Sequence, residues 1–277
     1  MASLSRPEVA GAVYGVLELA FIRDRDGRTR PDRALAQPPL QLSRVRYDDP
    51  QRPEIAVHTL LMLGGILAGD QHSLHVELAE QTTARMVMAA ATQVLSMPHG
   101  HAKQSLTLRL HAGSTLEWLA APTILFADAA FEQHTTIVLG RNARLTFLDI
   151  LVPGRLARGE MHAYRHYQSS LEIYDESENL LVCERSNLAP SRRATAVPGV
   201  LGQTAVVGSL FLLGHSLPAA QLAAKMHDPT TLIGVTTLPN QAGVLVRTLG
   251  HSASEVRGRL MELISSPSHM PALAPPH

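Results

Sequence analysis

The amino-acid sequence predicts a mainly β fold, and three observations support this prediction. Apolar residues alternate with polar ones along many short segments, as they do in strands with one buried and one solvated face. Turn-forming residues separate these segments, and helical patterns occur only in the C-terminal third. Many short strands with so few helices between them favour an all-β architecture over one in which strands and helices alternate.

The alternation is clearest where Leu74, Val76 and Leu78 are separated by His75 and Glu77. The same period of two is found at residues 17–21, 106–110, 135–139, 145–152, 170–174 and 180–184. Turn residues occur at 112–114, 140–142 and 175–179. The last of these segments is typical of a hairpin loop between two antiparallel strands.

Two helices are predicted near the C-terminal end. Residues 217–226 contain a proline followed by an alanine-rich run, which favours a helix. Residues 252–264 begin with Ser252 and Glu255 at the spacing of a capping box, and apolar residues then recur at helical intervals. We therefore expect one β domain over residues 1–266 that includes these helices. The segment 267–277 holds proline and small residues and is expected to be disordered.

Composition limits the kinds of partner. The 277 residues suffice for a large core, and the 24 basic and 24 acidic residues give a formal net charge of zero. A balanced chain lacks the electrostatic signature of nucleic-acid or anionic-membrane binding. Only 17% of residues are charged and 45% are hydrophobic, which favours apolar surface patches and hence protein partners.

The single cysteine and the apolar segments favour a cytoplasmic protein. Cys183 excludes an intramolecular disulfide and a cysteine-based zinc site, and its strand-like surroundings predict a buried side chain. The N-terminal residues lack the pattern of a secretory signal. The most apolar stretch, residues 205–214, is much shorter than the roughly 20 residues that a membrane-spanning helix needs.

Three motifs in a fixed order carry a family resemblance. They are the segment 64–70 (GGILAGD) with Thr82 and Thr83 after it; the segments 90–94, 113–119 (GSTLEWL) and 122–126; and the segments 154–160 (GRLARGE) and 181–185. In type, order and spacing these motifs resemble the urease accessory D/H (UreD) family. Each motif alone is weakly specific, but the ordered set is specific.

The resemblance implies a β-superhelical, solenoid-like body with a small helical portion. It also implies a non-catalytic scaffold that helps to deliver nickel to urease, with no tightly bound cofactor and only transient Ni²⁺. The implied partners are the urease apoprotein, the F-type accessory protein and, through it, the G-type accessory GTPase that carries the nickel.

The resemblance, together with residue chemistry, makes six residues candidates for lining a nickel passage: Asp70, Thr82, Thr83, Glu117, Asp149 and Glu160. Each also has a structural interpretation. The Asp70 carboxylate could bond the backbone of the glycine-rich turn, and Glu117 could simply face solvent. Glu160 could pair with Arg155 or Arg158. Glu184, next to Arg185, is interpreted as a surface residue.

Metal affinity favours acids and hydroxyls over histidines for this task. Imidazole and thiolate bind Ni²⁺ tightly, whereas a delivery route needs sites that also release the ion. Carboxylate, hydroxyl and water provide that weaker binding.

Two alternatives stay open from the sequence. One is a metal-dependent hydrolase that uses His99, His101 and His111 near Glu117, although no His-Glu-x-x-His arrangement is present among the 14 histidines. The other is a purely structural adaptor that holds urease in a receptive state without conducting metal.

Overall fold

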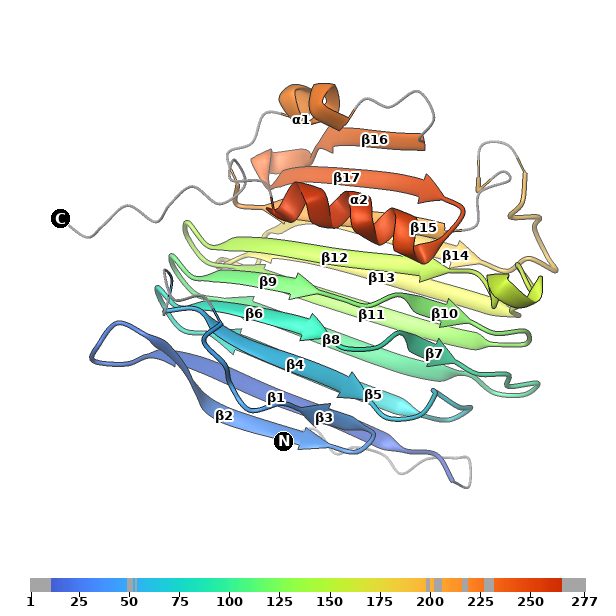
Figure 1. The fold of residues 1–277 in the computed structure, drawn as a ribbon, viewed down its shortest axis with the longest axis horizontal. Helices are drawn as coiled ribbons and strands as arrows, with labels where there is room; N and C mark the ends of the chain where they lie inside the picture. The colour runs from blue at the N-terminus through green and yellow to red at the C-terminus, as the bar shows by residue number, and fades with distance from the viewer. Residues whose placement is uncertain are drawn as a thin grey trace.

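The computed structural model describes residues 11–48, 52, 54–197, 200–201, 206–215, 219–226 and 232–265. Two β-sheets lie face to face and form a β-solenoid of about four turns, with a helix against one outer face (Figure 1). The predicted mainly β, solenoid-like fold with a small C-terminal helical portion is therefore confirmed. No helix in the described part of the chain is long and apolar enough to cross a membrane.

The smaller sheet, here called sheet A, has seven strands. In spatial order they are β14 (Leu180–Leu188), β13 (His166–Asp175), β11 (Ala130–Leu139), β8 (Ala102–Leu110), β5 (Gln71–Leu78), β1 (Tyr14–Arg23) and β2 (Thr29–Gln37). Most neighbours in this sheet are parallel, and only the outermost pairs β1–β2 and β13–β14 are antiparallel.

The larger sheet, sheet B, has ten strands. Its main path is β16 (Leu232–Thr237), β17 (Gly243–Gly250), β15 (Val206–Leu213), β12 (Arg144–Val152), β9 (Thr115–Leu119), β6 (Thr83–Met88), β4 (Ala56–Met62) and β3 (Leu40–Leu42), and β10 (Thr123–Leu125) joins β12 to β7 (Thr92–Val94). From β4 to β13 the chain crosses repeatedly between the sheets, so that each coil adds a parallel strand to both.

Rows of leucine fill the space between the sheets in the first coils. Leu17, Leu74 and Leu106 are in register on β1, β5 and β8, and each is at most 3% exposed. They belong to one hydrophobic cluster with Leu116 and Leu145 of sheet B. The burial of these in-register rows is the main source of stability for the solenoid.

The chain ends in antiparallel strands and two helices. The predicted hairpin between β13 and β14 is present, and the Asp175 carboxylate accepts bonds from the backbone N–H groups of Ser177 and Asn179. Helix α1 (Ala219–Met226) lies against β16. Helix α2 (Ala253–Ser265) covers β12, β15 and β17 on the outer face of sheet B (Figure 1). The tail 267–277 lies outside the described residues.

Helix α2 begins and packs as its sequence indicates. The Ser252 hydroxyl oxygen accepts a hydrogen bond from the Glu255 N–H at 3.2 Å, which is the capping bond that the spacing predicts. Val256 and Leu260 are completely buried against sheet B. Gly208 of β15 permits this close approach, because a Cβ there would lie 2.4 Å from Val256.

The prediction of a buried Cys183 is wrong, since this cysteine is exposed. Val182 points into the sandwich, so the next residue on β14 must point outward, where it lies beside Glu172 of β13. The local apolar run suggested burial, but the period of two decides which face each residue occupies.

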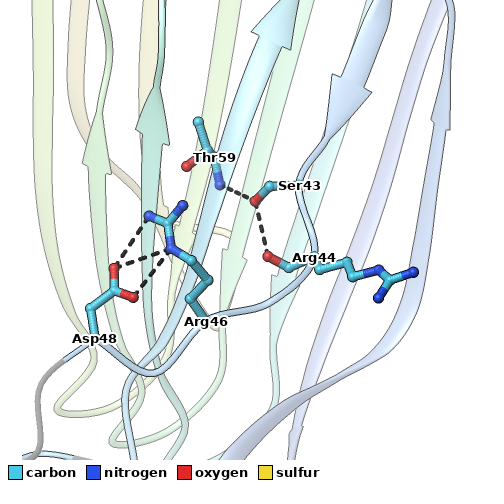
Figure 2. A network of polar contacts seen from close by, with 5 residues as sticks. All are labelled: Ser43, Arg44, Arg46, Asp48 and Thr59. Carbon is cyan, nitrogen blue, oxygen red and sulfur yellow. Dashed lines mark hydrogen bonds and ion pairs between the residues drawn. The ribbon is translucent and has the colours of Figure 1, made fainter.

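A polar network fixes the segment after β3 along the edge of β4 (Figure 2). The Ser43 hydroxyl accepts a bond from the Thr59 N–H at 2.8 Å and donates to the Arg44 carbonyl at 3.0 Å. Arg46 pairs with Asp48 through contacts of 3.2–3.3 Å. Both side chains of that pair are about half exposed, so solvent screens their attraction.

Candidate functional site

The inner face of sheet A changes from apolar to polar toward the C-terminal half. The row that contains Leu106 continues in register through Thr135 of β11 and Leu171 of β13 to Glu184 of β14. Glu184 lies on the same face of β14 as the buried Val182, so its carboxylate is directed between the sheets. The sequence-based interpretation of Glu184 as a surface residue paired with its neighbour is therefore incorrect.

Sheet B places a second polar row opposite Glu184. Asp149, Ser209 and Arg247 are in register on the adjacent strands β12, β15 and β17. Leu148 and Ile150 pack in the cluster that contains α2, so Asp149 between them must point to the opposite, inner face. The two rows bring two acids, one serine and one arginine together from four strands.

These residues line a cavity of about 530 Å³ between the sheets. Its polar walls are formed by Asp149, Tyr167, Ser169, Glu184, Ser209 and Arg247, and its apolar walls by Leu188, Val200, Leu201, Leu232, Ile233 and Leu249. A smaller cavity of about 30 Å³ shares Asp149, Glu184 and Ser209 and extends toward Gln133 and Thr135. Polar space therefore continues from the C-terminal edge toward the middle of the solenoid.

An ion pair crosses the cavity from one sheet to the other. The Arg247 Nη2 donates to both carboxylate oxygens of Glu184, at 2.7 and 2.9 Å. The Nε of the same guanidinium donates to the Ser209 hydroxyl at 3.2 Å. One guanidinium nitrogen thus contacts both carboxylate oxygens, and these charge-assisted hydrogen bonds are stronger than bonds between neutral groups.

Asp149 is the more perturbed of the two acids. Burial raises the pKa of its carboxyl to about 6, and the nearby Glu184 adds to the increase, while Arg247 and the Ile150 N–H oppose it. With both acids ionised, the cluster holds two negative charges and one positive charge. The excess negative charge lies between the sheets in a cavity that solvent reaches, and it favours the entry of a cation.

The chemistry of these groups suits weak binding of a divalent ion. Two carboxylates and several hydroxyls provide oxygen ligands, which bind Ni²⁺ less tightly than imidazole or thiolate does. Throughout the described segments, no group of three or more His, Cys, Asp and Glu side chains is placed to hold a metal.

Asp70, Thr82 and Thr83 each support a turn or a strand end. The Asp70 carboxylate, 4% exposed, accepts bonds at 2.8 Å from the N–H groups of Val13 and Leu67, and so fixes the glycine-rich turn. The Thr82 hydroxyl donates to the Ala79 carbonyl at 2.7 Å, and the Thr83 N–H donates to a buried threonine of β2. A place for these three residues in a metal passage stays a prediction.

Glu117 and Glu160 both form ion pairs away from the Asp149 cavity. Glu117, buried on the outer face of β9, pairs with Arg85 on the neighbouring β6. The Glu160 carboxylate bonds the Arg155 guanidinium at 2.5–3.2 Å and the Ala127 N–H at 3.0 Å. Arg155 lowers the pKa of Glu160. Among the six predicted passage residues, Asp149 alone lines this cavity.

The histidines proposed for a hydrolase do not meet. His101 and His111 flank the two ends of β8, which places them about 30 Å apart at the rise of a strand. His101 contacts Glu132 at 3.5 Å, and His111 contacts Glu77 at 2.8 Å. A single metal ion cannot be bound by both.

Comparison with known proteins agrees with the architecture and the motifs. The family model described as UreD urease accessory protein matches residues 14–275. Urease accessory protein UreD 2 of Streptomyces griseus is 34% identical over 254 residues, covering 89% of this chain and 86% of that protein. The UreD proteins of Haloarcula marismortui and Trichodesmium erythraeum are 32% and 33% identical, over 92% and 87% of this chain and 88% and 90% of their own lengths. This chain therefore belongs to the UreD family of urease accessory proteins.

Proposed function

We propose that this protein assists nickel insertion into apo-urease by giving Ni²⁺ a polar route through its interior, without a catalytic cycle of its own. Membership of the urease accessory family supports a role in urease maturation. The observation that supports a route for the metal is the cavity of about 530 Å³ whose walls carry Asp149 and Glu184.

In this proposal, Asp149 and Glu184 attract the ion and hold it briefly. Their carboxylates replace part of the water shell of Ni²⁺, while Ser209 and Tyr167 offer further oxygens. Binding by oxygen ligands is weak enough to allow release, which a delivery route requires. The smaller cavity toward Gln133 and Thr135 continues the same polar space.

The proposed partners follow from the resemblance and from the surface. Urease apoprotein would receive the ion, and the F-type accessory protein would link this chain to the G-type GTPase, which supplies the nickel. Exposed apolar residues near the cavity, among them Leu232 at 61% and Val200 at 38%, support a protein partner at this edge. We propose that the complex acts in the cytoplasm.

A double variant separates a metal route from a purely structural adaptor. Asp149→Asn with Glu184→Gln keeps the side-chain shapes and removes both negative charges. Coexpressed with urease and the accessory proteins, it should lower the nickel content of purified urease at least tenfold. Copurification of the complex should stay unchanged.

Glu172→Gln provides a matched control. Glu172 also lies on sheet A and pairs with an arginine, Arg185, at 3.0 Å, but it lies on the outer face. Urease matured with this control should carry nearly normal nickel. A normal nickel content with the double variant would contradict the proposed route and would support the structural adaptor.

A further inference from the structure

Both Glu184 carboxylate oxygens accept a hydrogen bond from a cationic side chain of the protein itself. The Arg247 guanidinium contacts both of them at 2.7 and 2.9 Å, and its Nε is held by Ser209 at 3.2 Å. These are the same oxygens that a metal ion would use. A metal ion bound to Glu184 therefore competes with the guanidinium for these oxygens.

We propose that Arg247 is an exchangeable counter-ion, which occupies the cation position beside Glu184 and Asp149 in the empty cavity and moves away when a divalent ion binds. This inference rests on the proposed passage of Ni²⁺ and deepens it, because it names the residue that controls how tightly the passage holds the ion.

Charge balance supports an exchange of one cation for the other. Two ionised acids and one guanidinium leave one net negative charge in the cluster. A divalent ion added beside Arg247 would leave one net positive charge, whereas a divalent ion in place of Arg247 gives neutrality. Because like charges repel strongly in a partly desolvated space, the arrangement without the guanidinium is the stable metal-bound state.

The fold provides room for this movement. The Arg247 side chain is 40% exposed, so its guanidinium has a path to water. Its partner on the neighbouring β16 is Gly234, which also lines the cavity. A Cβ built on Gly234 would meet no atom within 4 Å. The space beside Arg247 at this position of β16 is therefore open.

The exchange has two consequences for delivery. The ion must compete with an attached cation, which weakens its binding and speeds its release. When the ion leaves, Arg247 can pair with Glu184 again, so two carboxylates never face each other unbalanced. The same competition disfavours monovalent ions, because one positive charge gains nothing by replacing another.

The test measures Ni²⁺ binding directly on the full chain by equilibrium dialysis, and Ni²⁺ release by a chelator chase. Arg247→Met keeps much of the length of the side chain and removes the competing charge. It should bind Ni²⁺ at least tenfold more tightly than the unmodified protein and release it correspondingly more slowly. Arg247→Lys, which keeps a charge but loses the second nitrogen that bonds Ser209, should lie between the two.

Arg185→Met is the matched control, because Arg185 pairs with Glu172 on the outer face of the same sheet. It should leave Ni²⁺ affinity unchanged. Should Arg247→Met misfold, Gly234→Leu tests the same idea from the other side: filling the open space should hinder the arginine and lower affinity several-fold.

Unchanged or weaker Ni²⁺ binding by folded Arg247→Met, or unchanged binding by folded Gly234→Leu, would overturn the inference. These results are distinct from a failure of the proposed function. Binding is read on the purified protein, whereas the nickel content of urease reads the delivery route itself.

Discussion

The two halves of the solenoid interior are built on the same in-register rows but hold different contents. Around β1, β5 and β8 the rows consist of leucines such as Leu74 and Leu106, which pack against sheet B. At β14 the row that contains Leu106 ends in Glu184, which pairs with Arg247 of β17 beside a cavity of about 530 Å³.

The strand order explains why the cavity forms in the second half. Beyond the last coil, sheet B continues with three strands, β15, β17 and β16, whereas sheet A continues with β14 alone. The inner faces of the extra strands therefore lack a full opposing sheet, while α2 covers their outer faces. An interior with unequal sheets leaves space, and polar residues line part of it.

The largest expected change in stability is in the leucine core around β1, β5 and β8. Leu108→Ala removes a completely buried side chain from the leucine core and should lower the free energy of unfolding by about 2–5 kcal/mol. Leu232→Ala at the cavity edge removes a side chain that is 61% exposed and should change it little. Urea denaturation measures both. Equal losses would mean that the two halves do not differ in packing.

The next largest expected effect is the pH dependence that Asp149 gives to the free energy of unfolding. Its folded pKa, about 6, lies above the value of 3.8 expected when unfolded, so the folded state favours the neutral acid. The resulting stabilisation is present below about pH 4 and is lost as pH rises through about 6. Asp149→Asn should therefore remove this pH dependence and stabilise the metal-free protein at pH 7 by ~1–2 kcal/mol. Denaturation in the presence of chelator at pH 4 to 8 measures the free energy of unfolding of both proteins. The same pH dependence in the variant as in the unmodified protein would show that Asp149 is not its source.

Glu160→Gln tests whether an acid outside the cavity has a structural role. Its contacts with Arg155 and the Ala127 N–H favour that alternative. The variant should lower Tm by about 2–4 °C, and urease nickel should fall only as far as copurification of the complex does. A stable Glu160→Gln protein that binds its partners but fails to deliver nickel would restore Glu160 to the route.

The smallest effect is expected at the edge network of Figure 2. Asp48→Asn breaks the exposed pair with Arg46 and should change the free energy of unfolding by less than about 0.5 kcal/mol. High salt should abolish even that difference. A loss of several kcal/mol would mean that this edge, and not the leucine core, holds the first coil together.

The sequence predicted the fold better than the site, for a physical reason. Period-two alternation identified the strands and the hairpin after Asp175, because one face of most strands is solvated. Asp149 lies on β12, whose residues are mostly buried on both faces, and both of its neighbours, Leu148 and Ile150, are apolar, so the local pattern does not show which face the acid occupies. Glu184 could have been oriented from Val182, two residues earlier on the same face.

Pairing across the sheets could not be predicted from local patterns. The contact between Glu184 and Arg247 joins residues 63 positions apart, and its existence depends on the register of four strands. The motif-based candidates Asp70, Glu117 and Glu160 bond nearby backbone or an arginine, which local sequence alone does not distinguish from facing a passage.

In the proposed metal-bound state, Asp149 and Glu184 bind Ni²⁺ between the sheets in place of Arg247. Anomalous diffraction from crystals soaked in Ni²⁺, recorded at the nickel absorption edge, tests it most directly. We expect a peak inside the cavity within bonding distance of both carboxylates, with the Arg247 guanidinium displaced from Glu184. Nickel found only at surface histidines such as His99 or His111, with the Arg247–Glu184 pair intact, would contradict it.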